Sequence, residues 1–345
     1  MHTPKKPGLI RARTRDAFTT FDARTVDSTG SFLIGELERL DQKLHEPLVS
    51  VTWSRDIDLR SDVSMADEYS SFTNSSFAAA GGMAPGGKSW IGKDSNAITS
   101  MALDIGKTTN PLYLWGQEIS FTVPELASAQ KLGRPIDVQK YNALKLKHNM
   151  DVDEQVYIGD STLGAYGLLN SLLVTASNVV ANGSGHTTWA QKIADDTSGG
   201  STAADQILND VNTLVNAAWA ASGWAIIPEK LLLPPTQFSL LVSKKVSTAG
   251  NISIMQFLKE NNLLKTGQGR DLDIQPCKWL VGRGASGADR MIAYTQEEDR
   301  VRFPLVPLQR TPVEYRSIYQ LTTYFGRLGC VEFVYPETVQ YADGI

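Results

Sequence analysis

The segment from Gln117 to Asn170 constrains the fold of this chain more than any other part of its sequence. Alternating apolar residues at Ile119, Phe121 and Val123 predict a short strand, and the Pro-Glu-Leu that follows is typical of a helix start. A long polar stretch through Tyr157 predicts a helix at about 135–158, which a Gly-Asp break ends and a Gly-Leu-Leu-Asn sequence follows. The segment therefore predicts a strand, one long helix and a glycine turn, in this order.

The residues before this segment predict an arm followed by a hairpin. In the first fifty residues only Phe32–Leu44 has helical periodicity, so we expect an extended arm with one short helix. From Val49 to Phe121 the sequence alternates as strands do, with a stretch at 70–96 that is rich in Ser, Gly and Ala and cannot build a core. Two long strands with such a tip predict a projecting hairpin.

The residues after Asn170 predict a mixed α/β domain and a final hairpin. Thr202 and Asp205 form a capping box, and the apolar face that follows predicts a helix ending at Gly223. Further patterns predict strands at 226–233, 272–281, 291–294 and 301–305, with helices after Pro234 and at 253–260. The last segment alternates through Phe325, turns at Gly326–Gly329 and alternates again, which predicts a long hairpin.

This order of segments resembles the major capsid proteins of tailed bacteriophages. The resemblance is carried by the strand, helix and Gly-Leu-Leu-Asn turn of 117–170, by GRGASGADRMIAY, LLLPP and IMQFLKENN, and by the ending PETVQYADGI. It implies an α+β fold of the Hong Kong 97 type. It assigns an N-terminal arm to 1–50, an extended loop hairpin to 51–116, a discontinuous peripheral domain with the long spine helix to 117–170 and 312–345, and an axial domain to 171–311.

By this resemblance the chain is a structural subunit and not an enzyme, and it needs no cofactor or metal. Hexamers and pentamers of the chain would close into an icosahedral head that encloses phage double-stranded DNA, assembled in the cytoplasm of the bacterial host. Its partners would be further copies of itself, portal and decoration proteins, and a separate scaffolding protein, because the arm leaves no room for a fused one. A nanocompartment shell of the encapsulin type has the same fold and would enclose enzyme cargo instead of DNA.

Four residues are candidates for assembly contacts. Lys88, Trp90 and Lys93 lie in the tip of the predicted hairpin. Some members of the family link their shells by an isopeptide bond from a lysine of this loop, and the alternative for Lys88 and Lys93 is a solvated side chain. His148 shares a helical face with Tyr141, Leu144 and Val152, which indicates a packing or interface histidine. The charged residues between Lys140 and Glu154 are expected to form a solvated helix face.

Composition and charge exclude several other classes of protein. The formal net charge is −4 and the pI is about 5.7, so the chain as a whole has no electrostatic basis for wrapping nucleic acid. Cys277 and Cys330 lie in apolar contexts without zinc or redox spacing, which predicts buried, reduced thiols. No stretch approaches the roughly 20 apolar residues of a membrane span, and the histidines show no metal-ligand spacing.

Three short motifs match enzyme signatures without the context that those enzymes need. Gly82 to Ser89 fits the phosphate-binding loop G-x-x-x-x-G-K-[ST], yet no buried strand precedes it and a glycine stands where the helix should start. This leaves a nucleotide hydrolase using Lys88 as the distant alternative. Gly282–Gly287 fits a dinucleotide fingerprint, but a strand follows it, so a hairpin loop explains it better. Gly159-Asp160-Ser161 resembles a serine esterase motif, but no late histidine follows.

Overall fold

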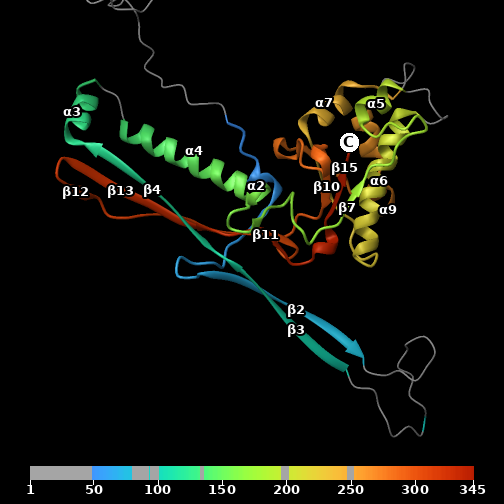
Figure 1. The fold of residues 1–345 in the computed structure, drawn as a ribbon, viewed down its shortest axis with the longest axis horizontal. Helices are drawn as coiled ribbons and strands as arrows, with labels where there is room; N and C mark the ends of the chain where they lie inside the picture. The colour runs from blue at the N-terminus through green and yellow to red at the C-terminus, as the bar shows by residue number, and fades with distance from the viewer. Residues whose placement is uncertain (1–48, 80–92, 94–100, 133–135, 196–201, 247–251) are drawn as a thin grey trace, which may run out of the picture. The chain divides into compact units, whose positions relative to one another are not determined.

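The computed structural model describes residues 49–79, 93, 101–132, 136–195, 202–246 and 252–345, and Figure 1 shows their arrangement. The predicted arm, including its helix at Phe32–Leu44, lies outside these residues apart from 49–50. The helices are α2 (Trp53–Asp56), α3 (Val123–Leu132), α4 (Ile136–Tyr157), α5 (Trp189–Ala194), α6 (Ala203–Ala221), α7 (Pro235–Ser243), α8 (Ile254–Asn261), α9 (Leu263–Gln268), η2 (Lys278–Leu280), η3 (Ala285–Gly287) and η4 (Pro336–Thr338).

The first sheet has six strands and lies against the long helix α4. Its strand order is β1-β11-β13-β12, with β14 also paired with β11 and β4 with β13. Its strands are β1 (Asp58–Arg60), β4 (Tyr113–Thr122), β11 (Val301–Arg310), β12 (Glu314–Arg316), β13 (Tyr319–Leu328) and β14 (Glu332–Phe333). Every fourth residue of α4 from Leu144 to Val156 is buried, as one face of a helix should be. The predicted strand and long helix are confirmed, except that Val123 begins α3.

The second sheet has five strands in the order β7-β15-β10-β8-β9. Its strands are β7 (Ala176–Asn178), β8 (Lys230–Leu233), β9 (Asp273–Pro276), β10 (Arg290–Tyr294) and β15 (Gln340–Asp343). Leu231 and Leu233 belong to one apolar cluster and Leu232 to the other, because successive side chains of a strand point to opposite faces. Helix α6 contacts β10 and β15. It starts at the predicted cap, where the Thr202 side chain accepts a hydrogen bond from the Asp205 N–H.

A separate hairpin is formed by β2 (Tyr69–Ala79) and β3 (Met101–Pro111), which pair antiparallel along their full lengths. The predicted hairpin is therefore confirmed, but its first strand lies within the Ser-rich stretch. The expected strand pattern at Val49–Val63 instead forms helix α2 and the short β1. The β2–β3 ribbon is held by backbone hydrogen bonds between its two strands, so small polar side chains suffice in it. Helix α2 is held by the carboxylate of Asp153, which lies far along the chain, and the alternation of neighbouring residues cannot reveal such a contact.

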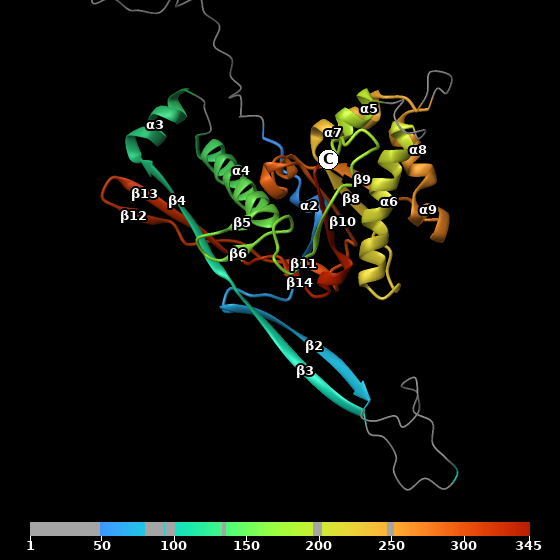
Figure 2. The ribbon, with the colours of Figure 1, turned by 45° about the vertical axis from the view of Figure 1, so that its right-hand side comes forward.

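The strand pairing differs from the prediction in four places. Figure 2 shows both sheets from a second angle. No hairpin forms across Gly326–Gly329, because β14 pairs with β11, whereas β13 forms a hairpin with β12 through Ser317. The sequence grouped β11 with the strands of 171–311 and β15 with the segment 312–345. In the structure β11 joins the six-stranded sheet, and β15 joins the five-stranded sheet. The loop before β10 is no hairpin either, since β8 separates β9 from β10. Such pairings depend on long-range packing.

Candidate assembly surfaces

The turn Gly167–Asn170 closes the end of helix α4. The N–H groups of Gly167, Leu168 and Leu169 donate to the carbonyls of Ile158 (3.2 Å), Val156 (2.7 Å) and Tyr157 (3.0 Å). These carbonyls have no partner inside the helix, so the turn satisfies them. Asn170 fixes the turn itself, because its Oδ1 accepts from the Gly167 N–H at 2.8 Å and its Nδ2 donates to the Ile158 carbonyl at 2.7 Å. The end of α4 is therefore held against the core.

Two glycines are required for this arrangement. Gly159 has φ +73°, and a Cβ there would lie 2.1 Å from the Ala165 carbonyl oxygen. A Cβ at Gly167 would lie 2.4 Å from the carbonyl carbon of Tyr157. Both contacts are with backbone atoms, which cannot move aside as a side chain can. The Gly-Asp break and the Gly-Leu-Leu-Asn sequence thus have a steric cause.

A buried carboxylate joins α4 to α2. Asp153 is fully buried, and its Oδ1 accepts from the N–H groups of Thr52 (2.8 Å) and Trp53 (3.0 Å), the first turn of α2. Its Oδ2 accepts from the Trp279 indole N–H at 2.7 Å and lies 3.2 Å from the Lys278 ammonium. The expectation of a solvated helix face is therefore wrong for Asp153, because this carboxylate serves as the missing cap of another helix.

A second buried carboxylate connects α2 to the five-stranded sheet. Asp56 is fully buried and accepts a hydrogen bond from the Tyr157 hydroxyl of α4. Arg55 forms a two-point ion pair with it at 2.7 and 2.8 Å, and the Lys230 ammonium of β8 lies 3.1 Å away. Helix α4 packs against the six-stranded sheet, and β8 is a strand of the five-stranded sheet. Asp56 and Asp153 together therefore join the two halves of the fold.

A third buried carboxylate fixes the root of the β2–β3 hairpin. Glu332 of β14 is fully buried and accepts a hydrogen bond from the Ser70 hydroxyl of β2. Arg302 and Arg60 lie 2.8 and 3.4 Å from the same carboxylate, and Arg60 also donates to the Ser71 carbonyl at 3.0 Å. The first residues of β2 are therefore tied to β1, β11 and β14 of the six-stranded sheet.

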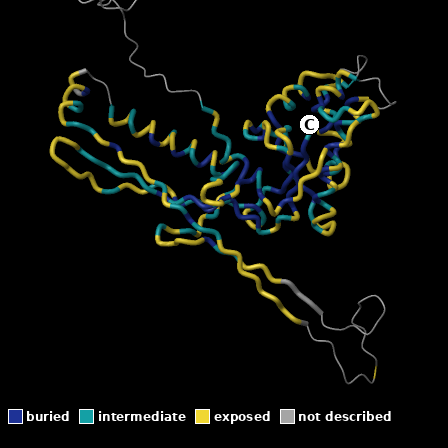
Figure 3. The backbone as a smooth tube through the Cα atoms, viewed as in Figure 1, coloured by how far each residue is buried: buried dark blue, intermediate teal, exposed yellow. Residues whose placement is uncertain are grey.

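Beyond this root the hairpin is exposed on both faces, as Figure 3 shows. From Ala102 to Thr109 every residue of β3 is exposed. Leu103 and Ile105 are 55% and 62% accessible, although apolar side chains of this size are usually buried. A ribbon with one apolar face that none of the described residues covers has the character of a surface that another molecule covers.

The predicted assembly residues have different positions. His148 is buried on α4 and meets Trp115 of β4 edge-on, with ring centroids 4.8 Å apart. Burial lowers the pKa of His148, and this effect outweighs the opposing charge of Asp151. The face shared by Leu144, His148 and Val152 thus packs on the sheet. Lys93 is exposed, and Lys88 and Trp90 lie outside the described residues. A contact of any of these four residues with another copy stays a prediction.

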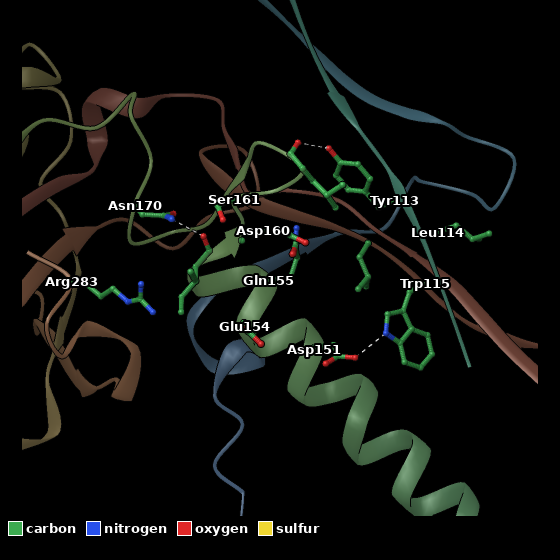
Figure 4. A pocket seen from close by; sticks show the side chains of 14 residues that line it. Tyr113, Leu114, Trp115, Asp151, Glu154, Gln155, Asp160, Ser161, Asn170 and Arg283 are labelled. Carbon is green, nitrogen blue, oxygen red and sulfur yellow. Dashed lines mark hydrogen bonds between the residues drawn. The ribbon is translucent and has the colours of Figure 1, made fainter. Parts of the chain in front are cut away.

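A cleft of about 620 Å³ lies between α4, β4 and the β5 (Gly159–Asp160) and β6 (Ala165–Tyr166) pair, and Figure 4 shows its lining. The Trp115 indole donates to Asp151 at 3.0 Å, and the Tyr113 hydroxyl donates to the Leu163 carbonyl at 3.0 Å. Ser161 lines the cleft but has no side-chain hydrogen bond to a base within the described part of the chain. The cleft therefore lacks the nucleophile and base pair of a serine esterase.

The other enzyme-like motifs also lack the context that they require. The strand before Gly82–Ser89 is β2 of the two-stranded ribbon, whose residues 73–75 are exposed, and the motif itself lies outside the described residues. The glycine loop at 282–287 is followed by β10, as predicted, and the Asp289 and Asp343 carboxylates accept from its Gly282 and Ala285 N–H groups. Those amides are thus already occupied by anionic groups, whereas a dinucleotide fingerprint offers them to phosphate.

The two cysteines fit the expectation from sequence. Cys277 is buried and Cys330 half-buried, both are free thiols, and burial raises their pKa values to about 12 and about 11. Among the described residues, no helix is long and apolar enough to cross a membrane. Within the same residues no cluster of three His, Cys, Asp or Glu side chains could hold a metal ion.

The whole fold is similar to solved phage capsids. The capsid of Myoviridae phage XM1 has 16% sequence identity and a TM-score of 0.68, with 90% of this chain and 98% of that chain covered. The capsid of a native GTA particle has 12% identity and a TM-score of 0.57, covering 94% and 99% of the two chains. A protein of Mycobacterium phage Ogopogo has 12% identity and a TM-score of 0.53, covering 91% and 98%. At these identities the likeness establishes the fold, and the α+β fold of the Hong Kong 97 type is confirmed.

The sequence itself matches one protein family. No curated protein matches the chain. The family model described as "Major capsid protein" matches residues 86–345, which is well over half of the chain. The chain therefore belongs to the major capsid protein family.

Proposed function

We propose that this phage major capsid protein forms hexamers and pentamers, and that these close into the icosahedral head around double-stranded phage DNA. Family membership makes the role structural, and we assign no reaction to the chain. The observation that carries the proposal is the β2–β3 ribbon, whose exposed Leu103 and Ile105 have no cover in the described part of the chain. Such a surface is unfavourable in an isolated subunit and natural in one that interlocks with copies of itself.

The domain roles form part of this proposal. We assign the β2–β3 hairpin to the extended loop, the six-stranded sheet with α3 and α4 to the peripheral domain, and the five-stranded sheet with α5–α9 to the axial domain. Because β11 pairs within the six-stranded sheet and β15 within the five-stranded sheet, we assign these strands to the peripheral and axial domains, respectively. Residues 1–50 would be the arm. The buried Asp56 and Asp153 would keep the two domains in one orientation during assembly.

The proposed partners follow from this role. Copies of the chain would make most contacts, and portal, decoration and separate scaffolding proteins would join them in the host cytoplasm. The packaged DNA would be enclosed without sequence-specific binding, and the net charge of −4 gives the chain as a whole no electrostatic basis for wrapping it.

Negative-stain electron microscopy of the purified full-length chain, with its sedimentation profile, tests the proposal. We expect closed icosahedral particles or five- and six-membered rings. A compact monomer that persists even when the chain is produced with the other structural proteins of its phage would contradict it. Particles that protect enzyme cargo and no DNA from digestion would contradict the genome-enclosing role.

A further inference from the structure

A buried ion pair joins helices α5 and α6, which contact each other in the half of the fold that holds the five-stranded sheet (Figure 2). The Lys192 ammonium of α5 donates to Oδ2 of Asp210 in α6 at 2.6 Å and to the Val180 carbonyl at 2.9 Å. The two charged side chains, which we call the α5–α6 pair, are only 2% and 3% accessible. The Trp189 indole N–H donates to the same Oδ2 at 3.0 Å.

The surroundings of this pair are apolar. Ile207 and Val211, the neighbours of Asp210 along α6, are buried in the same apolar cluster as Trp189. Taking an ammonium and a carboxylate out of water costs free energy that their mutual attraction returns only in part. Burial raises the pKa of Asp210, and this effect outweighs the opposing contacts with Lys192 and Trp189. A proton that moves along the 2.6 Å hydrogen bond leaves a neutral acid beside a neutral amine.

Two other pairs of lysine and aspartate show how the α5–α6 pair differs. Lys265 and Asp271 also lie 2.6 Å apart, but their side chains are 40% and 80% accessible, so water solvates both charges. Lys230 and Asp56 are buried and 3.1 Å apart, but Arg55 makes a two-point ion pair with Asp56 and is a permanent cation beside it. Within the described ranges, only the α5–α6 pair combines close approach and burial of both partners with the absence of a second cation.

The nitrogen and the carboxyl carbon of the pair lie within reach of each other. Because a C–O bond adds about 1.2 Å, the Lys192 Nζ lies no more than about 3.8 Å from the Asp210 Cγ. Well-oriented groups in such proximity reach effective concentrations of roughly 10⁵–10⁸ M. This is far above the concentration of water even in the bulk liquid. Condensation of the two groups is therefore favoured over hydrolysis in this buried place.

We propose that Lys192 and Asp210 condense into an amide that links α5 to α6 within one subunit. One Nζ proton moves to Oδ2, and the lone pair of the resulting amine attacks Cγ to form the C–N bond. A second Nζ proton follows to Oδ2, the Cγ–Oδ2 bond breaks, and one water molecule leaves. The third proton stays on the nitrogen, where it can donate to the Val180 carbonyl. The Trp189 indole N–H stabilises negative charge on Oδ2 as that bond breaks.

This step is a single internal condensation that involves no substrate, oxidant or reductant. It removes two buried charges and leaves an uncharged amide in their place, which ends the cost of keeping both ions out of water. The link lies inside one copy and does not join copies to each other. It is expected equally in free subunits and in assembled particles, so the proposal does not depend on the shell function.

Intact mass spectrometry of the full chain, denatured after folding, tests the proposal. We expect protein sampled from fresh and from aged preparations to become lighter than its sequence predicts by the mass of one water molecule. Trypsin should then fail to cleave the unfolded chain after Lys192, and the fragments that carry Lys192 and Asp210 should appear joined. A mass that stays at the sequence value overturns the proposal, and so does a loss of water that maps to any other residue.

Variants separate this amide from other losses of water. Lys192→Met should keep its full sequence mass, and a loss of one water in this variant would refute the link. The matched control is Lys265→Met, which removes the exposed partner of Asp271 and should lose one water as the original chain does. Trp189→Phe should slow the loss at least about tenfold, because the donor to Oδ2 is gone. If Lys192→Met does not fold, the joined fragments of the original chain still decide the question.

Discussion

Removing the Asp153 carboxylate should destabilise the subunit strongly. Its two oxygens accept from the Thr52 N–H, the Trp53 N–H and the Trp279 indole N–H, and Lys278 adds an ion pair. Asp153→Ala leaves three hydrogen-bond donors without this partner at a fully buried position, whereas the exposed Lys278 ammonium can be solvated instead. Removing one partner from such a buried set costs about 3–5 kcal/mol. Asp153→Asn keeps one acceptor oxygen and should cost about 2 kcal/mol.

Urea unfolding of the isolated subunit, followed by tryptophan fluorescence, measures these losses. The matched control is Glu154→Ala, one residue further along α4, where the side chain is exposed and has no partner among the described residues. That change should stay within about 0.5 kcal/mol of the original chain. The role assigned to Asp153 is refuted if Asp153→Ala costs less than about 1 kcal/mol, or no more than the control.

Three further measurements test other parts of the structure. Gly167→Ala should destabilise the subunit by at least about 2 kcal/mol, because its Cβ meets the Tyr157 backbone, whereas Gly106→Ala, with no neighbour closer than 3.9 Å, should be nearly neutral in urea unfolding. Because burial lowers the pKa of His148, the unfolded chain takes up its proton more readily. The folding stability is therefore at its full value above about pH 6.5 and declines as the pH falls below it. The His148→Phe variant should show a flatter plot of unfolding midpoint against pH in that range. Cys277, whose pKa is raised to about 12, should react with a thiol reagent at pH 8 only as fast as the subunit unfolds, and rapid reaction in the native state would contradict its burial.

Sequence patterns predicted the elements with strong local signals. The long helix ending at Tyr157, the Thr202 cap and the strand at Arg290–Tyr294 all carry a periodicity or a cap within a few residues. The turn at Gly167 was also predicted, from the Gly-Leu-Leu-Asn sequence. The structure gives its steric cause, because a Cβ at Gly167 would strike the Tyr157 backbone. These features depend on neighbours in the chain.

The features that sequence reasoning missed depend on partners far away in the chain. Helix α2 exists because Asp153, about a hundred residues later, caps it. Strand β14 pairs with β11 because Glu332 is held by Arg302 across the sheet. Asp153 itself looked like one charge among many on a polar helix, and nothing in the spacing around it indicated burial.

The place of β15 in its sheet has a consequence during synthesis. Gln340–Asp343 lies between β7 and β10, so a nascent chain that ends before these residues leaves β7 without its partner strand and β10 paired with β8 alone. The five-stranded sheet can therefore close only after Gln340–Asp343 has been synthesised and has joined β7 to β10. While the residues before Gln340 are being translated, the growing subunit cannot complete this sheet.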